Sequence, residues 1–215
     1  MNISFSYNIH KDVDNFIKTL NSINNSSPTK LQKLFKSRFG EKYQREYIHK
    51  FIKSYTKEQN IDFNEKLVEI KDNWERVSCC YFERAEKLFQ YKYSLPIKVY
   101  LTTNSRCSYN IKARYFFLFI DAESTNAIIM HELFHFYTWQ SFGEKLVNKG
   151  VSKETYNDLK ESLTEILNLE FSDLLSGKSD SGYYQHQECR LLIKNLWLKF
   201  KDLNKVVEEY LLLNN

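Results

Sequence analysis

The sequence predicts a mainly helical α+β fold with one small β-sheet. Its 215 residues contain only 2 Pro and 5 Gly, which leaves few turn residues for a many-stranded sandwich or barrel. Over most of the chain, apolar residues recur three and four positions apart, as on one face of a helix. One stretch after Pro96 alternates with a period of two, which is typical of a strand. With 42% hydrophobic and 27% charged residues, the composition excludes a disordered or collagen-like chain.

The charge distribution argues against nucleic acid or a membrane as a partner. The 31 basic and 27 acidic side chains give a formal charge of +4 and are spread along the chain. Proteins that bind nucleic acids concentrate Lys and Arg on one face or arm. Here the basic residues between 30 and 50 alternate with Leu, Phe and Tyr, so solvated helix faces are favoured over a functional basic surface. No stretch approaches the roughly 18 apolar residues that span a bilayer.

The N-terminus and the cysteines favour a cytoplasmic location. The residues from Met1 to Asn8 lack the basic and apolar regions of a secretory signal. The four cysteines form no CxxC pair, which disfavours a zinc knuckle and favours free thiols in a reducing compartment. They are Cys79, Cys80, Cys107 and Cys189.

Amphipathic helices are predicted from Lys11 to about Tyr91. Three sets of apolar residues follow one another, and a longer helix then begins near Asp62. The clearest break lies at 24–28, with Pro28 just inside a new helix. We expect 1–215 to form a single domain with 1–91 as an N-terminal helical region, and whether that region is a separate lobe stays open. The three sets are Phe16, Leu20 and Ile23; Leu31, Phe35 and Phe39; and Tyr43, Tyr47, Phe51 and Tyr55.

A small sheet and a second group of helices are predicted after Pro96. Apolar and more polar residues alternate over 97–102, and the run 113–120 is a second candidate strand. Capping residues then precede a dense apolar helix that is expected to end near Phe142, where Gly143 offers a stop. Two or three further helices are expected, near 152–175, 183–200 and 202–213.

The chemistry is predicted from the apolar segment that carries His131, Glu132 and His135. The two histidines are four residues apart on a predicted helix, so both imidazoles lie on one face. Glu132 lies one residue further round, where its carboxylate can reach a water held by a metal on the histidines. This is the HExxH arrangement. The alternative is that both residues are ordinary core histidines bonded to carbonyls. That interpretation leaves three ionisable groups in an apolar run, where burial without a partner is costly.

A third ligand is expected from the next helix. A catalytic zinc site uses three protein ligands and keeps one position open for water. Glu161 and Glu165 are one turn apart, which suits one as the ligand and the other as a hydrogen-bond partner of a ligand histidine. An exposed acidic face is the alternative for either glutamate alone. The spacing by itself does not decide which of the two is the ligand.

The segments His131-Glu-Leu-Phe-His135 and Glu161-Ser-Leu-Thr-Glu165 together resemble the motifs of the gluzincin zinc metallopeptidases. Members of that family carry HExxH on one helix and a glutamate ligand on the next. The resemblance covers about 115–175. It implies that Glu161 is the third ligand and that Glu165 is the helper one turn further on.

The same resemblance implies a fold and a substrate. It suggests a zincin-like metallopeptidase core over 92–215. In that core, the strand at 115–120 resembles the edge strand to which gluzincins add an extended peptide. A core strand buried on both faces is the alternative. The related metzincin pattern HExxHxxGxxH is excluded, because Thr138 and Ser141 occupy its glycine and last histidine positions.

The resulting hypothesis is a zinc metallopeptidase that binds one Zn²⁺ per chain and hydrolyses a peptide or protein substrate. A metal at this site lowers the pKa of a water and polarises the scissile carbonyl. Glu132 then takes the proton as general base and passes it to the leaving amine. The resemblance implies an oxyanion donor from a downstream Tyr or His, for which Tyr183 and Tyr184 are the candidates, with His186 as a further one. The alternatives are a catalytically inactive zincin-fold regulatory or protein-interaction protein, and a helical interaction module without metal.

Overall fold

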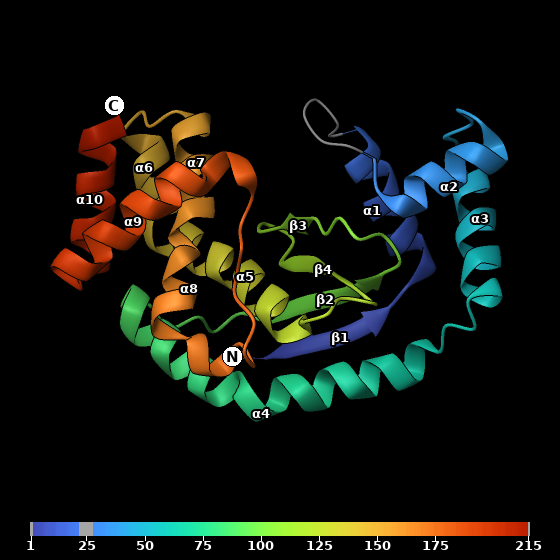
Figure 1. The fold of residues 1–215 in the computed structure, drawn as a ribbon, viewed down its shortest axis with the longest axis horizontal. Helices are drawn as coiled ribbons and strands as arrows, with labels where there is room; N and C mark the ends of the chain where they lie inside the picture. Colours follow the sequence, from blue (N-terminus) through green and yellow to red (C-terminus); the bar gives the residue numbers. More distant parts are fainter. Residues whose placement is uncertain (1, 22–27, 215) are drawn as a thin grey trace. The chain divides into compact units, whose positions relative to one another are not determined.

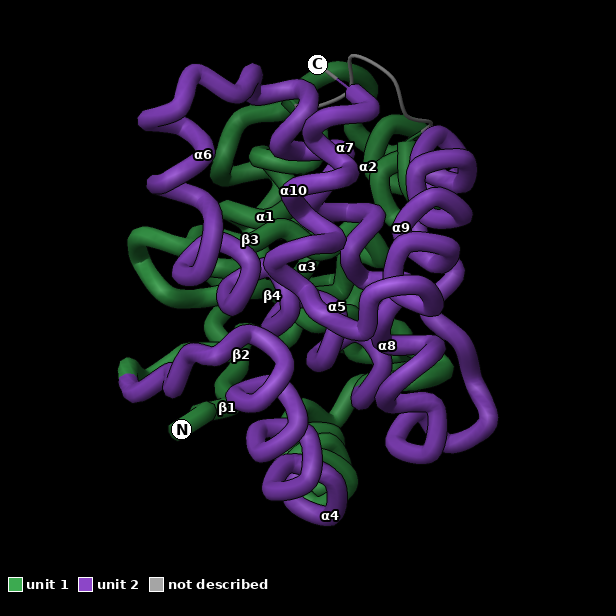
Figure 2. The backbone as a smooth tube through the Cα atoms, turned by 90° about the vertical axis from the view of Figure 1, so that its left-hand side faces the viewer, with its two compact units in different colours: residues 1–74, 95–125 green, residues 75–94, 126–215 purple. Residues whose placement is uncertain are grey.

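The computed structural model describes residues 2–21 and 28–214, and the chain divides into two compact units. Unit 1 comprises 1–74 and 95–125, and unit 2 comprises 75–94 and 126–215 (Figure 2). These units do not follow the expected ranges of 1–91 and 92–215, because the segment after Leu95 clusters with the first 74 residues. A single domain stays a prediction.

The secondary structure agrees with a mainly helical α+β fold. No helix within the described ranges is long and apolar enough to cross a membrane.

Unit 1 contains a four-stranded mixed sheet. Its strands are β1 (Ile3–Tyr7), β2 (Ile97–Thr102), β3 (Tyr109–Asn110) and β4 (Tyr115–Phe119), in the spatial order β1-β2-β4-β3. β1 and β4 both pair parallel with β2, and Figure 1 shows the three strands side by side. The two predicted strands are therefore confirmed, while β1 and β3 add to them. The expectation that 115–120 forms an edge strand is wrong, because β3 pairs antiparallel on the outer side of β4.

Strand β1 has a short alternation of apolar residues and serines, which is typical of a strand. Ile3, Phe5 and Tyr7 are separated by single serines, and Phe5 pairs in register with Val99 of β2. Val99 in turn pairs with Phe116 of β4, and both of these side chains are fully buried. Strands β2 and β4 are therefore the interior strands of the sheet.

Helices α1 (Ile9–Asn21), α2 (Lys30–Phe39) and α3 (Arg45–Glu58) form the helical part of unit 1, as predicted. Thr29 caps α2 through a reciprocal pair of hydrogen bonds with Gln32, so Pro28 precedes the helix rather than lying inside it. Residues 24–27 of the predicted break lie outside the described residues. The buried core of this part consists of Val13, Phe16, Leu31, Phe35, Ile48, Phe51 and Ile52.

A buried polar contact attaches α1 to the end of β2. The carboxylate of Asp12 accepts hydrogen bonds from Thr102 Oγ1 at 2.6 Å and from Thr103 Oγ1 at 2.9 Å. Burial raises the pKa of Asp12 to about 6, and these hydrogen bonds oppose the rise. Since burial of a carboxylate without donors is costly, the contact fixes the helix at one position along the strand.

The long helix α4 (Phe63–Phe89) begins in unit 1 and ends in unit 2, where it packs on α5 (Thr125–Thr138). The Phe89 ring lies 4.7 Å from the Phe134 ring between centroids, and Tyr81 donates a hydrogen bond to the Met130 carbonyl at 3.2 Å. α5 is buried along nearly its whole length, which explains why its sequence is apolar on every face.

The helical structure does not end at Gly143, contrary to the expectation. A π-helical turn, Trp139–Gly143, leads from α5 directly into α6 (Glu144–Asn148). A Cβ at position 143 would overlap the Trp139 ring, so the glycine permits this turn instead of ending the helix.

Four further helices complete unit 2. They are α7 (Lys153–Leu163), α8 (Glu165–Glu170), α9 (Gln187–Phe200) and α10 (Leu203–Asn214), with 3₁₀ turns at Ser172–Leu174 and Tyr184–His186. The helix expected near 152–175 is thus two helices, separated by a turn at Thr164.

Candidate metal centre

Helix α5 places His131 and His135 next to each other inside unit 2. Their ring centroids are 4.5 Å apart, and the ring planes are nearly perpendicular at 80°. His135 is almost fully buried, whereas the His131 side chain keeps 14% of its surface exposed. The spacing of four residues therefore brings the two imidazoles together, as the sequence indicates.

Glu161 of α7 completes a group of three metal-ligand side chains. Its Oε2 atom lies 3.6 Å from His131 Nε2 and 3.5 Å from His135 Nε2. One ligand atom from each residue lies within 4.8 Å of the other two, and the described residues contain no other such group. We call His131, His135 and Glu161 the three-ligand group.

The spacing within the three-ligand group fits a shared metal ion better than direct hydrogen bonds. Distances of 3.5–3.6 Å exceed those of N–H···O hydrogen bonds, and Glu161 Oε2 is buried without a hydrogen-bond partner among the described residues. Ligand atoms at about 2.0–2.1 Å from a tetrahedral zinc are roughly 3.3 Å apart. The observed separations are close to that value, so these residues could hold a metal ion.

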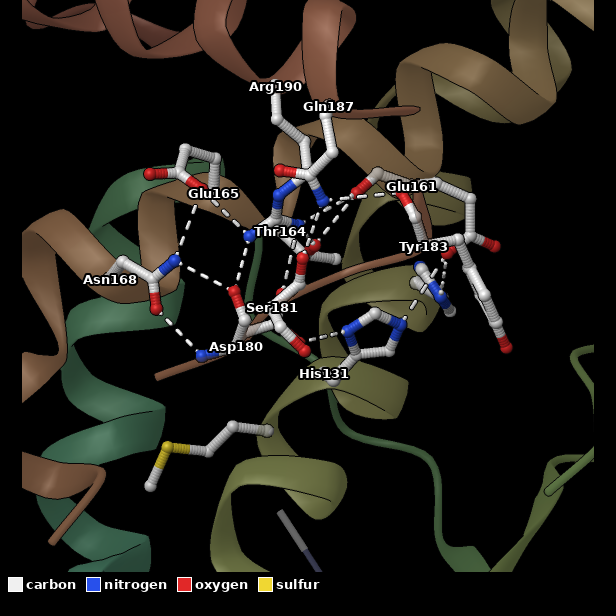
Figure 3. Close-up of polar contacts among 12 residues, drawn as sticks. His131, Glu161, Thr164, Glu165, Asn168, Asp180, Ser181, Tyr183, Gln187 and Arg190 are labelled. Atoms are coloured by element: carbon white, nitrogen blue, oxygen red, sulfur yellow. Dashed lines mark hydrogen bonds and ion pairs between the residues drawn. The ribbon is translucent and has the colours of Figure 1, made fainter. Parts of the chain in front are cut away.

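Asp180 is not a member of the three-ligand group but contacts His131, which is. Its Oδ1 lies 2.9 Å from His131 Nδ1, the ring nitrogen that faces away from Glu161 (Figure 3). A carboxylate at this nitrogen fixes the ring orientation and leaves Nε2 free to bind a metal. Asp180 lies in the irregular segment between the 3₁₀ turns at Ser172–Leu174 and Tyr184–His186.

Glu165 does not have the position that the sequence suggested for it. Its Oε2 accepts hydrogen bonds from Arg190 Nη2 at 2.7 Å and from Asn168 Nδ2 at 3.1 Å, and no contact within 2–21 and 28–214 joins it to either histidine. The turn at Thr164 separates Glu165 from the helix that carries Glu161. Asp180 thus has the contact with a ligand histidine that was expected of Glu165.

Thr164 and Arg190 explain why the chain turns there. Thr164 Oγ1 donates a hydrogen bond to the Glu161 carbonyl at 2.7 Å and accepts one from Arg190 Nη1 at 2.6 Å. A side-chain hydroxyl that bonds to the preceding turn competes with the regular helical pattern. Helix α7 therefore ends at Leu163, less than one turn after its metal-ligand candidate.

Arg190 also fixes the segment that carries Asp180. Its Nη1 lies 3.0 Å from Asp180 Oδ2, and its Nη2 donates to the Asp180 carbonyl at 2.5 Å. Asn168 bonds to both the N–H and the carbonyl of Asp180, at 2.8 and 2.9 Å. Gly182 adopts φ +60°, and a Cβ there would lie 2.7 Å from Arg190 Nη1, so a glycine is required beside the guanidinium. Figure 3 shows this network on the Asp180 side of His131.

Asp180→Asn is expected to weaken zinc binding by about 10–100-fold, because loss of the charge on this carboxylate lowers the basicity of His131 as a ligand. The matched control is Asp158→Asn, since Asp158 pairs with His186 at 3.2 Å instead of with a member of the three-ligand group. Competition with a chromophoric chelator measures both affinities. Equal zinc affinity in Asp180→Asn and the wild type would contradict the assigned role of Asp180.

Glu132 is buried next to His131 of the three-ligand group, and one of its carboxylate oxygens has no hydrogen-bond partner among the described residues. Only 7% of its surface is exposed, and no described residue donates a hydrogen bond to its Oε2. Burial raises the pKa of Glu132 to about 7, while the charge of His131 lowers it and that of Glu161 raises it further. A carboxyl group with a pKa near neutrality can both accept and return a proton.

The two histidines have opposite electrostatic environments. Burial disfavours charge on His131, but its hydrogen bond with Asp180 and the nearby carboxylate of Glu161 raise its pKa to about 10. Burial lowers the pKa of His135 to about 3, although Glu161 opposes the effect. The Glu161 carboxylate keeps a low pKa despite burial, because His135, His131 and Lys160 all favour its ionised form. In the absence of a metal, the carboxylates therefore favour a proton on His131 and not on His135.

The three candidates for the oxyanion donor are placed differently. Tyr184 is 94% exposed, and His186 is buried and paired with Asp158. No contact in the described part of the chain joins Tyr184 or His186 to the three-ligand group. Tyr183 is about half-exposed, and its backbone carbonyl accepts a hydrogen bond from Gln187 Nε2 at 3.3 Å. Their catalytic roles stay predictions.

Sequence reasoning missed Asp180, Arg190 and Lys160. Arg190 had a readable signal, because it lies at helical spacing with Ile193 and Trp197 on the buried face of α9. An arginine on such a face needs a buried acidic partner. The only sequence signal for Asp180 was its position in a polar loop between two glycines.

The chain matches no protein-family model, no curated protein and no solved structure. The interpretation of the three-ligand group therefore depends on its own residues and geometry.

Proposed function

We propose that this protein is a zinc-dependent metallopeptidase of the gluzincin type, in which His131, His135 and Glu161 hold one zinc ion per chain. The observation that carries the proposal is the position of Glu161 Oε2. This atom faces both histidine Nε2 atoms at 3.5 and 3.6 Å and has no hydrogen-bond partner of its own among the described residues.

The donor set favours zinc over calcium and magnesium. Two imidazoles and one carboxylate are the ligands of many catalytic zinc sites, which keep a fourth position open. Calcium and magnesium prefer sites made of oxygen ligands alone. The carboxylate of Asp180 on the second nitrogen of His131 is a further feature that supports a zinc site.

The chain's own residues account for the proton transfers of hydrolysis. A zinc ion bound here supplies a water of lowered pKa and polarises the scissile carbonyl. Glu132 accepts the proton of the attacking water through its unpaired carboxylate oxygen and delivers it to the leaving amine. The oxyanion donor is proposed among Tyr183, Tyr184 and His186, of which Tyr183 is about half-exposed.

The peptide substrate and the zincin-like core over 92–215 are proposed from the resemblance in the two motifs. Strand β4 supports this substrate less than expected, because β3 lies on its outer side. The alternative is a catalytically inactive zincin-fold protein that uses the metal for regulation or interaction. The presence of Glu132 at a buried position, with no hydrogen-bond partner for its Oε2 among the described residues, favours the enzyme.

Metal content and peptide hydrolysis test the proposal. Purified protein is expected to contain about one zinc per chain, to cleave members of a peptide library, and to lose cleavage when a chelator removes the metal. Zinc binding without cleavage of any peptide would favour the inactive alternative. A folded protein that takes up no zinc when zinc is supplied would contradict the proposal altogether.

A further inference from the structure

We infer that Lys160 is a positioning residue that restricts Glu161 to binding the metal through one oxygen. The inference rests on the proposed metal site and adds a role for a side chain that neither motif contains. Lys160 directly precedes Glu161 in α7, and only 4% of its surface is exposed.

A lysine is rarely buried to this extent, so its contacts need an explanation. Its Nζ lies 2.7 Å from Glu161 Oε1, and both side chains are more than 90% buried. A buried ammonium group next to a site for a divalent cation is electrostatically unfavourable unless a negative group lies between them. Glu161 is that negative group.

The two oxygens of Glu161 have different partners. Oε1 forms the ion pair with Lys160 Nζ, whereas Oε2 faces His131 and His135. Carboxylates bind metals through either one or both oxygens. The buried ion pair with Lys160 at 2.7 Å would hold Oε1 away from a metal bound at Oε2.

The consequence concerns the open coordination position of the site. If both oxygens of Glu161 bound the metal, the second would occupy space that water and a substrate carbonyl need. With Oε1 bound to Lys160, the metal keeps three protein ligands. The geometry of Lys160 thus favours a catalytic site over a closed structural one.

Cobalt substitution tests this role without a substrate. Cobalt(II) in the wild type is expected to give the intense visible absorption of a four-coordinate ion. In Lys160→Met, the released Oε1 is expected to bind, which weakens the absorption and shifts it to shorter wavelength. Lys160→Arg keeps a cationic donor and is expected to restore the wild-type spectrum, and Lys153→Met, at an exposed lysine of the same helix, serves as the control.

The outcomes separate the inference from the proposed function. Identical cobalt spectra in the wild type and folded Lys160→Met would overturn the role of Lys160 and leave the metal site standing. A wild type that binds neither cobalt nor zinc would instead overturn the site itself. If the Lys160 variants do not fold, X-ray absorption of the wild-type zinc protein decides. One bound carboxylate oxygen supports the inference, and two overturn it.

Discussion

Glu161→Ala is expected to abolish stoichiometric zinc binding, whereas Glu165→Ala is expected to retain about one zinc per chain. Glu161 supplies the only carboxylate oxygen in the three-ligand group, at 3.5–3.6 Å from both histidine nitrogens. Glu165 instead pairs with Arg190 at 2.7 Å. Loss of a ligand should exceed the roughly 10–100-fold effect of losing a residue that only supports one.

The measurement is elemental analysis after dialysis against a zinc buffer, with circular dichroism to confirm that both variants are folded. Glu165→Ala leaves one acidic partner of buried Arg190 missing, so its melting temperature is expected to fall. Arg190 keeps Asp180, which limits the loss. Zinc retained in Glu161→Ala but absent from Glu165→Ala would reverse the assignment of the third ligand.

The parts of this site that could be predicted are those that depend on local helix geometry. His131 and His135 lie on one face of α5 because residues four apart do so on any helix. The choice of Glu161 as the third member needed more than spacing, and the family resemblance supplied it. Strand β2 was predicted because its alternation of apolar and exposed residues is a local signal.

The parts that could not be predicted depend on contacts between distant residues. Asp180 is 49 positions from His131 and reaches it from an irregular segment, which has no periodicity to read. The turn that separates Glu165 from Glu161 arises from the contact of Thr164 with Arg190, 26 positions away. Local propensity would continue the helix there, so tertiary contacts decided where it ends.

The position of Lys160 could not be predicted from the sequence either, for a different reason. A lysine next to a glutamate on a helix is usually solvated, and nothing in 215 residues distinguishes this pair from others. What distinguishes Lys160 is its burial, which depends on how α7 packs in unit 2. The motifs therefore identified the metal-ligand candidates, while the residues that orient them became visible only in the fold.

Glu132→Gln is expected to reduce peptide hydrolysis by about 10²–10⁴-fold, which is the contribution of a general base, while zinc content stays unchanged. Glutamine has nearly the same size as glutamate but cannot accept a proton at neutral pH. Since Glu132 is not a member of the three-ligand group, the metal is expected to remain. The assay compares hydrolysis rates of the two proteins at equal zinc occupancy, and equal rates would exclude Glu132 as the base.

The same substitution is expected to raise the melting temperature of the metal-free protein. Burial raises the pKa of Glu132 from 4.5 to about 7, so the folded state binds this proton more tightly than the unfolded state. That contribution to stability is complete below about pH 4.5 and is lost as the pH rises through 7. The gain from glutamine should thus be larger at pH 8 than at pH 5. A buried carboxylate that costs stability is expected at a catalytic position, whereas a lower melting temperature at pH 8 would indicate a structural role for Glu132.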